Sequence, residues 1–280
     1  MARILAGCSR VASNPLRLIR TGVRCPGAAT LALVTDRLEG PRGKLARARR
    51  HFEDVRAILD QLDEDNASLA KQDYNEAEGR YEFSLQDDWT LHPDLPLIVG
   101  DVLHNARSAL DHLAWALARE PGTHTGFPIL DPARPSPRND FYGRKQLATI
   151  KRAVKMKLER IQPYKRKHLM RSLWWLNQLD IADKHHLVLP TAHNAPGFGT
   201  MMPDGYDIKP VATFAVARGT IFAIAVGPFD PQLQWQIKPH VDVVFTHQPV
   251  MYYPLDLVLT TILDDIEFKV FPLFGPADFW

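Results

Sequence analysis

The segment VGDVLHNARSALDHLAWAL, Val99 to Leu117, constrains the fold more than any other part of the chain. Successive residues of a helix advance by about 100° around its axis. One side of this helix therefore collects a seam of apolar residues within about 80°: Leu103, Ala106, Leu110, Leu113 and Leu117. The opposite side collects, within about 120°, Asp101, His104, Asn105, Ser108, Asp111, His112 and Trp115. The pattern predicts a helix from near Pro96 to the Pro121-Gly122 pair, with Asp94 as its N-cap.

The polar side of this helix carries unusual residue types. A solvated helix face is usually built from Lys, Glu and Gln, because these residues have high helix propensity and lose little rotamer freedom. This face instead carries short, directional polar groups and a tryptophan. Three interpretations stay open: a polar network that joins two helices, a functional cleft or dimer-interface site, or a surface with no role.

Other elements follow from the spacing of apolar residues. Helical periodicity is found over residues 36–66, 143–162, 165–182 and 254–270. The Gly40-Pro41 pair is expected to break or delay the first of these helices. Alternation predicts a strand over residues 80–86, and after residue 186 the apolar period changes to two, which predicts strands separated by turns.

These elements define an α+β fold. We expect a helical bundle over about 36–186, an antiparallel sheet over about 187–250, and a final helix over about 254–270 that packs back on the bundle. The hydrophobic content of 45% and the charged content of 24% are typical of a globular domain. Residues 36–280 are therefore expected to form a single domain.

Residues 1–35 differ from the rest of the chain. They contain five arginines and no acidic residue, and they also contain both cysteines of the chain, Cys8 and Cys25. We expect a basic, disordered leader; a transit peptide and a start codon placed too early are the alternatives. The later chain has no cysteine, so neither a disulfide nor a Cys-based zinc site holds the core.

Charge and hydropathy limit the partners only weakly. The net charge of +2 does not by itself require a nucleic acid or a membrane. No apolar run approaches the ~18 residues that span a bilayer. We therefore expect no membrane partner and a cytoplasmic location.

A second group of polar residues follows the helix predicted over 165–182. The segment IADKHHL places Asp183, Lys184, His185 and His186 at a helix-to-strand junction. Junctions of this kind often carry functional groups, and histidine titrates near neutral pH. We interpret these four residues, together with His104, as candidate substrate-binding residues.

Several of these segments share a pattern with known proteins. GDVLHNARSALDHLAWALA, FPI (127–129), IQPY (161–164) and LNQLDIADKHH resemble a widespread bacterial family of uncharacterised proteins. The resemblance spans about residues 97–186. It implies a common fold but no activity.

A looser resemblance is to the HEPN superfamily of helical bundles, many of which are RNases of toxin–antitoxin and phage-defence systems. Its signature is an Arg followed after four to six residues by a His, and Arg107 and His112 fit with four residues between them. The resemblance implies metal-independent RNA cleavage at a composite site between two subunits, with His112 in acid–base work and Arg107 stabilising phosphate charge. Asn105 and Asp111 are further candidates for this catalytic site. Ser108, where Asn or Asp is more typical, and the β-rich C-terminal part depart from the pattern.

The segment from Arg144 to Arg171 is strongly basic, with eleven Lys or Arg residues and Glu159 as its single acid. A nucleic-acid backbone fits such a surface, and Tyr164, Trp174 and Trp175 offer rings on which bases stack. A solvated helix face balanced by acidic residues elsewhere explains the same charges.

The sequence leaves three hypotheses about function. The first is a HEPN-like endoribonuclease or RNA-binding relative that acts without a metal or other cofactor, with RNA as partner and as a homodimer. The second is a metal-dependent hydrolase that uses His104, Asp111, His112, His185 and His186 as ligands. The third is a non-catalytic binding or scaffold protein whose polar stripe is structural. The first two require the polar side of the helix and residues 183–186 to meet in one pocket.

Overall fold

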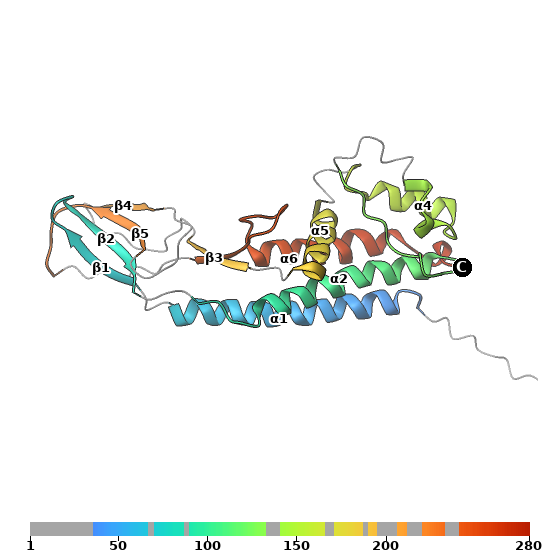
Figure 1. The fold of residues 1–280 in the computed structure, drawn as a ribbon, viewed down its shortest axis with the longest axis horizontal. Helices are drawn as coiled ribbons and strands as arrows, with labels where there is room; N and C mark the ends of the chain where they lie inside the picture. The colour runs from blue at the N-terminus through green and yellow to red at the C-terminus, as the bar shows by residue number, and fades with distance from the viewer. Residues whose placement is uncertain are drawn as a thin grey trace, which may run out of the picture. The chain divides into compact units, whose positions relative to one another are not determined.

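The computed structural model describes residues 36–66, 70–86, 90–132, 141–165, 171–186, 190–194, 206–211, 220–232 and 241–280. The chain divides into two units, Met1–Thr35 and Asp36–Trp280, and every described residue lies in the second. The predicted leader at residues 1–35 therefore lies outside the described residues. Within the second unit the fold is α+β (Figure 1).

Five helices of the described part bear on the site. Their bounds are α1 Glu39–Asn66, α2 Leu95–Leu117, α4 Arg152–Arg160, α5 Arg171–His185 and α6 Leu255–Asp264. A π-helical turn over Asp265–Val270 continues α6, and short 3₁₀ turns follow over Phe271–Leu273 and Pro276–Asp278. None of the described helices is both long and apolar enough to cross a bilayer.

The strands form two antiparallel sheets. Their bounds are β1 Ala70–Asn75, β2 Arg80–Leu85, β3 Pro190–Asn194, β4 Asp207–Pro210, β5 Ile221–Val226 and β6 Val241–Phe245. Four strands pair in the order β1-β2-β5-β4, and β3 pairs with β6. The β1–β2 hairpin closes through Gly79, whose φ of 63° lies in the left-handed region that glycine adopts at little cost.

The structure changes several of the sequence-based expectations. The strand predicted over residues 80–86 is confirmed as β2, but the sheet is not confined to residues 187–250, because β2 pairs with β5 and also with β1, which was not predicted. Helix α1 begins at Glu39, and Pro41 lies in its first turn, where a proline breaks no helical hydrogen bond. Asp94 is the N-cap of α2, but its side chain makes no capping hydrogen bond.

The basic helix expected over 143–162 is shorter than predicted. A 3₁₀ turn over Lys145–Leu147 comes first, and α4 follows only from Arg152. Within the region of strands and turns predicted over about 187–250, residues 187–189, 195–205, 212–219 and 233–240 lie outside the described residues.

Helix α2 lies at the centre of the helical part. It packs against α1, α5 and α6, and α1 runs beside it in Figure 1. The predicted leucine seam is fully buried, and Val99, Val102, Ala109 and Ala114 widen the buried face. Phe52 and Val55 of α1 and Leu259 of α6 are buried in the same hydrophobic cluster as the seam. Burial of a leucine side chain contributes about 1.5–3 kcal/mol, so this seam is a principal source of stability.

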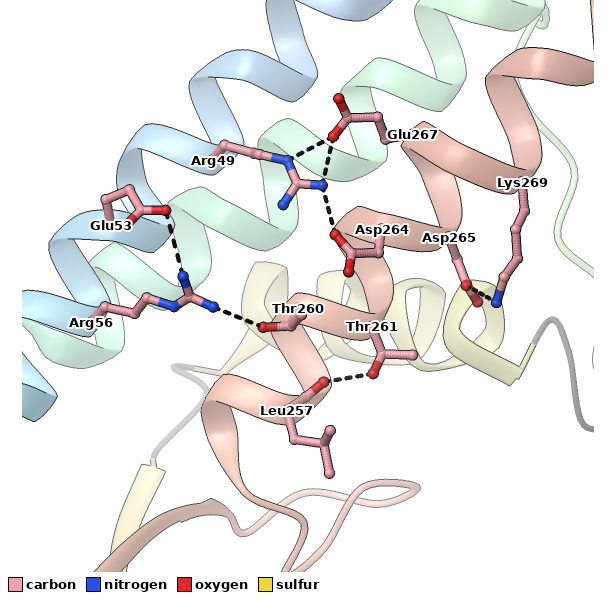
Figure 2. A network of polar contacts seen from close by, with 10 residues as sticks. All are labelled: Arg49, Glu53, Arg56, Leu257, Thr260, Thr261, Asp264, Asp265, Glu267 and Lys269. Atoms are coloured by element: carbon pink, nitrogen blue, oxygen red, sulfur yellow. Dashed lines mark hydrogen bonds and ion pairs between the residues drawn. The ribbon is translucent and has the colours of Figure 1, made fainter.

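Ion pairs join α1 to the last helix (Figure 2). The Arg49 guanidinium donates to Glu267 from both Nε and Nη2, at 2.8 and 2.6 Å, and to Asp264 from Nη2 at 2.8 Å. Burial alone would lower the pKa of Arg49, but the hydrogen bonds and charges of the two carboxylates outweigh burial and raise the pKa.

In the π-helical turn, buried Asp265 pairs with Lys269 and accepts a hydrogen bond from Ser172 of α5.

Basic side chains around α4 hold the C-terminal segment. Lys151 Nζ donates to the backbone carbonyls of Ala277 and Phe279 and lies 4.4 Å from the centre of the Trp280 ring. Lys157 Nζ donates to the carbonyl of Leu273 at 3.0 Å and to Asp278 Oδ2 at 2.7 Å. Part of the basic segment is thus used within the fold.

The Asp278 carboxylate makes stability depend on acid pH. Burial alone would raise its pKa, but hydrogen bonds from Lys157 and from the Gly275 N–H outweigh burial and lower the pKa. A lowered folded-state pKa means that the carboxylate adds stability above the unfolded value of about 3.9, and this stability is lost as the pH falls through the folded value.

We therefore expect Asp278→Asn to lower the free energy of unfolding at pH 7 by up to about 1 kcal/mol, because Lys157 is partly exposed and solvent screens the pair. The difference from the parent should shrink below about pH 4. Urea unfolding at a series of pH values measures it. A difference that stays constant down to pH 2 would contradict this account.

Candidate functional site

The polar side of α2 is divided among three environments. Asp101, His104, His112 and Trp115 are exposed, whereas Ser108 and Asp111 are partly buried. Asn105 is buried, and its Nδ2 donates to the Asp101 carbonyl at 2.8 Å within the same helix. The candidate catalytic residue Asn105 thus serves the backbone of its own helix.

Arg107 and Asp111 together hold the loop that follows α2. Arg107 Nη2 donates to the Phe127 carbonyl at 2.7 Å and to Asp111 Oδ1 at 3.2 Å. The same Oδ1 accepts the Phe127 N–H at 2.8 Å. Both polar groups of one loop residue are therefore satisfied by two side chains one helical turn apart. A Cβ on Gly126 would lie 3.3 Å from Asp111 Oδ1, so a glycine lets the loop approach this closely.

Gln162 fixes the next residues of the same loop. It is fully buried, and its Oε1 accepts the Leu130 N–H at 3.0 Å while its Nε2 donates to the Pro128 carbonyl at 2.8 Å. Three segments that carry the family resemblance, in α2, at 127–129 and at 161–164, are therefore joined by one hydrogen-bonded network. For Asp111, the structure therefore favours the interpretation of the polar side as a structural hydrogen-bonding network.

A cavity of about 600 Å³ opens beside Arg107. Among the described residues of its lining, the basic groups are Arg107, His124, Arg144 and Lys145, and the one acidic residue is Asp111. The rest of the lining is polar or small and consists of Thr123, Thr125, Gly126 and Gln146. A hydrogen-bonded turn places His124 here, because the Thr125 N–H donates to the Gly122 carbonyl and the Gly122 N–H to Thr125 Oγ1.

Two guanidinium nitrogens of this lining have no hydrogen-bond acceptor among the described residues. They are Nη1 of Arg107 and Nε of Arg144, and both are shielded from solvent. A buried donor without an acceptor costs about 1–3 kcal/mol. Sites of this kind favour an anion, since a negatively charged acceptor forms strong hydrogen bonds with a guanidinium.

A second cavity, of about 620 Å³, lies between the start of α1 and the C-terminal turns. Apolar side chains make up much of its lining, and Arg49, which also lines it, is bound to Asp264 and Glu267 (Figure 2). We therefore take the first cavity as the candidate site.

His112 does not line this candidate site. It is exposed, and its Nδ1 lies 3.3 Å from the position that a Cβ on Gly40 of α1 would occupy. It follows Arg107 by five positions, so the two side chains leave the helix about 140° apart. Arg107 and His112 of one chain therefore face different neighbours.

The Asp183–His186 segment contacts α2 away from the cavity. Helix α5 extends through His185, so Asp183 and Lys184 lie in its last turn rather than in a loop. Asp183 lies so close to Gly100 that a Cβ on Gly100 would be 2.7 Å from its Oδ1. His185 and His186 are exposed.

His104 is the member of the α2 polar side that does meet α5. Its Nδ1 lies 3.7 Å from Oδ1 of Asp180, and Lys184 Nζ donates to Oδ2 of the same carboxylate at 2.7 Å. Asp180 is buried. The expected shared pocket of Arg107, His112 and Asp183–His186 is thus replaced by separate contacts along α2.

The metal-dependent hypothesis requires several ligands at one place. Within the described ranges, no group of three or more His, Cys, Asp or Glu side chains is arranged to hold a metal ion. In particular, His104, Asp111, His112, His185 and His186 are all described and are not assembled into such a group.

The aromatic residues proposed for base stacking lie in packed surroundings. Tyr164 donates to Glu159 at 3.3 Å, and the Trp175 ring centre lies 5.5 Å from that of Tyr253. The indole nitrogens of Trp174 and Trp175 are shielded from solvent. Of the basic segment, Arg144 and Lys145 are the residues that line the cavity.

Sequence reasoning missed His124 as a site residue. Four residues lie between Arg119 and His124, and they include the helix-breaking Pro121-Gly122 pair. His124 therefore has no helical periodicity with other polar residues. Only the folding of the loop back onto α2, through Phe127, places it near Arg107.

Comparisons of the chain with family models, with curated proteins and with solved structures find no match. The resemblances seen in its motifs therefore stay hypotheses, and the geometry of the site carries the functional argument.

The contact between Gly100 and Asp183 predicts a matched pair of glycine substitutions. Gly100→Ala should lower the free energy of unfolding by about 1 kcal/mol, because the overpacking cost exceeds the gain in helix propensity. Gly43→Ala in α1, where no atom lies within 4 Å of the new Cβ, should raise it by up to about 1 kcal/mol. Thermal or urea unfolding measures both, and equal effects would show that α5 does not pack closely on Gly100.

Proposed function

We propose that this chain is a HEPN-like RNA-binding protein that holds RNA phosphate in the cavity beside Arg107. The observation that carries the proposal is the lining itself: three permanent cations, Arg107, Arg144 and Lys145, meet around one cavity. Three basic side chains around one cavity are suited to bind the phosphates of RNA, and arginine binds phosphate through paired N–H donors.

The chemistry of the remaining lining supports the same ligand class. Thr123, Thr125 and Gln146 offer neutral hydrogen-bonding groups, and no aromatic or large aliphatic side chain is among the described residues of the lining. Phosphate and sugar contacts of proteins are made by side chains of this kind. Binding would then depend on the backbone of RNA rather than on its bases.

Arg144→Ala and Lys145→Ala are each expected to weaken binding of a single-stranded RNA about tenfold, since each removes a cation from the site. The slope of the logarithm of the binding constant against the logarithm of the salt concentration is negative, and its magnitude should decrease by about 0.7 for each lost phosphate contact. Lys71→Ala, in the exposed Lys71–Asp73 pair of β1, is the charge-matched control and should leave both quantities unchanged. Fluorescence anisotropy over a salt series measures them. Equal losses in all three variants would overturn the cavity as the RNA site.

Metal-independent RNA cleavage is a second candidate, favoured by the presence of an imidazole in the cavity. His124 lines it together with Arg107. An imidazole there is suited to take the proton of a ribose 2′-hydroxyl while the oxygen attacks phosphorus, and the cations stabilise the added negative charge. The leaving 5′-oxygen takes up a proton, and a 2′,3′-cyclic phosphate forms.

Incubation with total RNA in EDTA tests cleavage, and two variants separate the histidines. If the cavity is the catalytic site, His124→Ala should lower the rate at least about a hundredfold, and His112→Ala should leave it unchanged. The reverse result would instead support the composite site that the HEPN resemblance implies. Absence of cleavage in the parent protein would leave RNA binding alone as the proposal.

A further inference from the structure

The charge of the cavity lining sets which form of phosphate fits best. Among the described residues of the lining, Arg107, Arg144 and Lys145 contribute three positive charges and Asp111 one negative charge, which gives two positive units before His124 is counted. An internal RNA phosphate is a diester with a single negative charge. A terminal phosphate is a monoester, whose charge at pH 7 is about −1.5 to −2.

The hydrogen-bond donors of the lining also favour a phosphate monoester. Nη1 of Arg107 and Nε of Arg144 have no acceptor among the described residues, although other nitrogens of both groups are bound. A monoester offers three unesterified oxygens, each of which accepts hydrogen bonds, whereas a diester offers two. Both nitrogens are shielded from solvent, so each guanidinium must reorient to bring them to a ligand in the cavity.

The acidic residue of the lining is already engaged. Asp111 Oδ1 accepts the Phe127 N–H and a hydrogen from Arg107, so its charge is partly offset by its own neighbours. No aromatic or large aliphatic side chain on which a nucleobase could stack is among the described residues of the lining. A site with this composition recognises a phosphate group and leaves the base outside.

We infer that the cavity is a pocket for a phosphate monoester, and that its source is the phosphorylated end of an RNA strand. The choice of RNA as the source rests on the proposed function; the preference for a monoester rests on the charges and donors of the lining. The protein then binds RNA ends in preference to internal sites, whatever the terminal base.

Fluorescence anisotropy with one short RNA sequence tests this inference on the full chain. The probes carry a 5′-phosphate, a 3′-phosphate or hydroxyl groups at both ends, with the dye at the opposite end or within the strand. One of the phosphorylated probes should bind at least about tenfold more tightly than the hydroxyl probe. Arg144→Gln and Lys145→Ala should abolish that difference, and Lys71→Ala should preserve it.

Thermal unfolding in the presence of adenosine monophosphate or inorganic phosphate tests the monoester pocket separately from the RNA-binding function. Equal binding of all three RNA probes would overturn the monoester pocket and keep the RNA function. No binding of any RNA, together with an increase in Tm by adenosine monophosphate that Arg144→Gln removes, would overturn the RNA function and keep the monoester pocket. No effect of any of these ligands would overturn both.

Discussion

The burial of helix α2 is the constraint on which the rest of the structure depends. Its buried surface extends well beyond the leucine seam and includes Gly100, Asn105 and Ala114. Helices α1, α5 and α6 each pack on it, and the loop after it is bound to its Arg107 and Asp111. The polar groups of α2 are therefore divided among several neighbours: His104 meets α5, His112 lies beside α1, and Arg107 and Asp111 bind the loop, which is why they do not form one site.

The sequence predicts those elements whose apolar residues follow a regular period. The helix Leu95–Leu117, the strand Arg80–Leu85 and the final helix lie close to where periodicity puts them, because each buries a continuous stripe. Strand β1 has the sequence AKQDYN and no such stripe; its pairing with β2 supplies the order. The basic helix is overestimated because residues 143–150, GRKQLATI, contain basic and apolar residues like those of the helix that follows, yet only a 3₁₀ turn over Lys145–Leu147 forms there.

The candidate site is less predictable than the fold for a physical reason. A helical wheel gives the direction of a side chain but not the element that covers it. Arg107 and His112 are close in sequence, yet one binds a loop and the other lies beside Gly40. His124 joins Arg107 only through hydrogen bonds made by Phe127 and the loop backbone, which no spacing rule contains.

The double use of Arg107 has a consequence for how this corner of the molecule responds to change. One guanidinium contributes to the charge of the cavity and also anchors the backbone at Phe127, with Asp111 as the second anchor. Replacing Arg107 would therefore remove one anchor of the loop that carries His124 and a cation in the same step. If the cavity binds the proposed phosphate, binding and local folding are linked at this position, so Arg144 and Lys145, which do not bind the Phe127 backbone, test binding more directly.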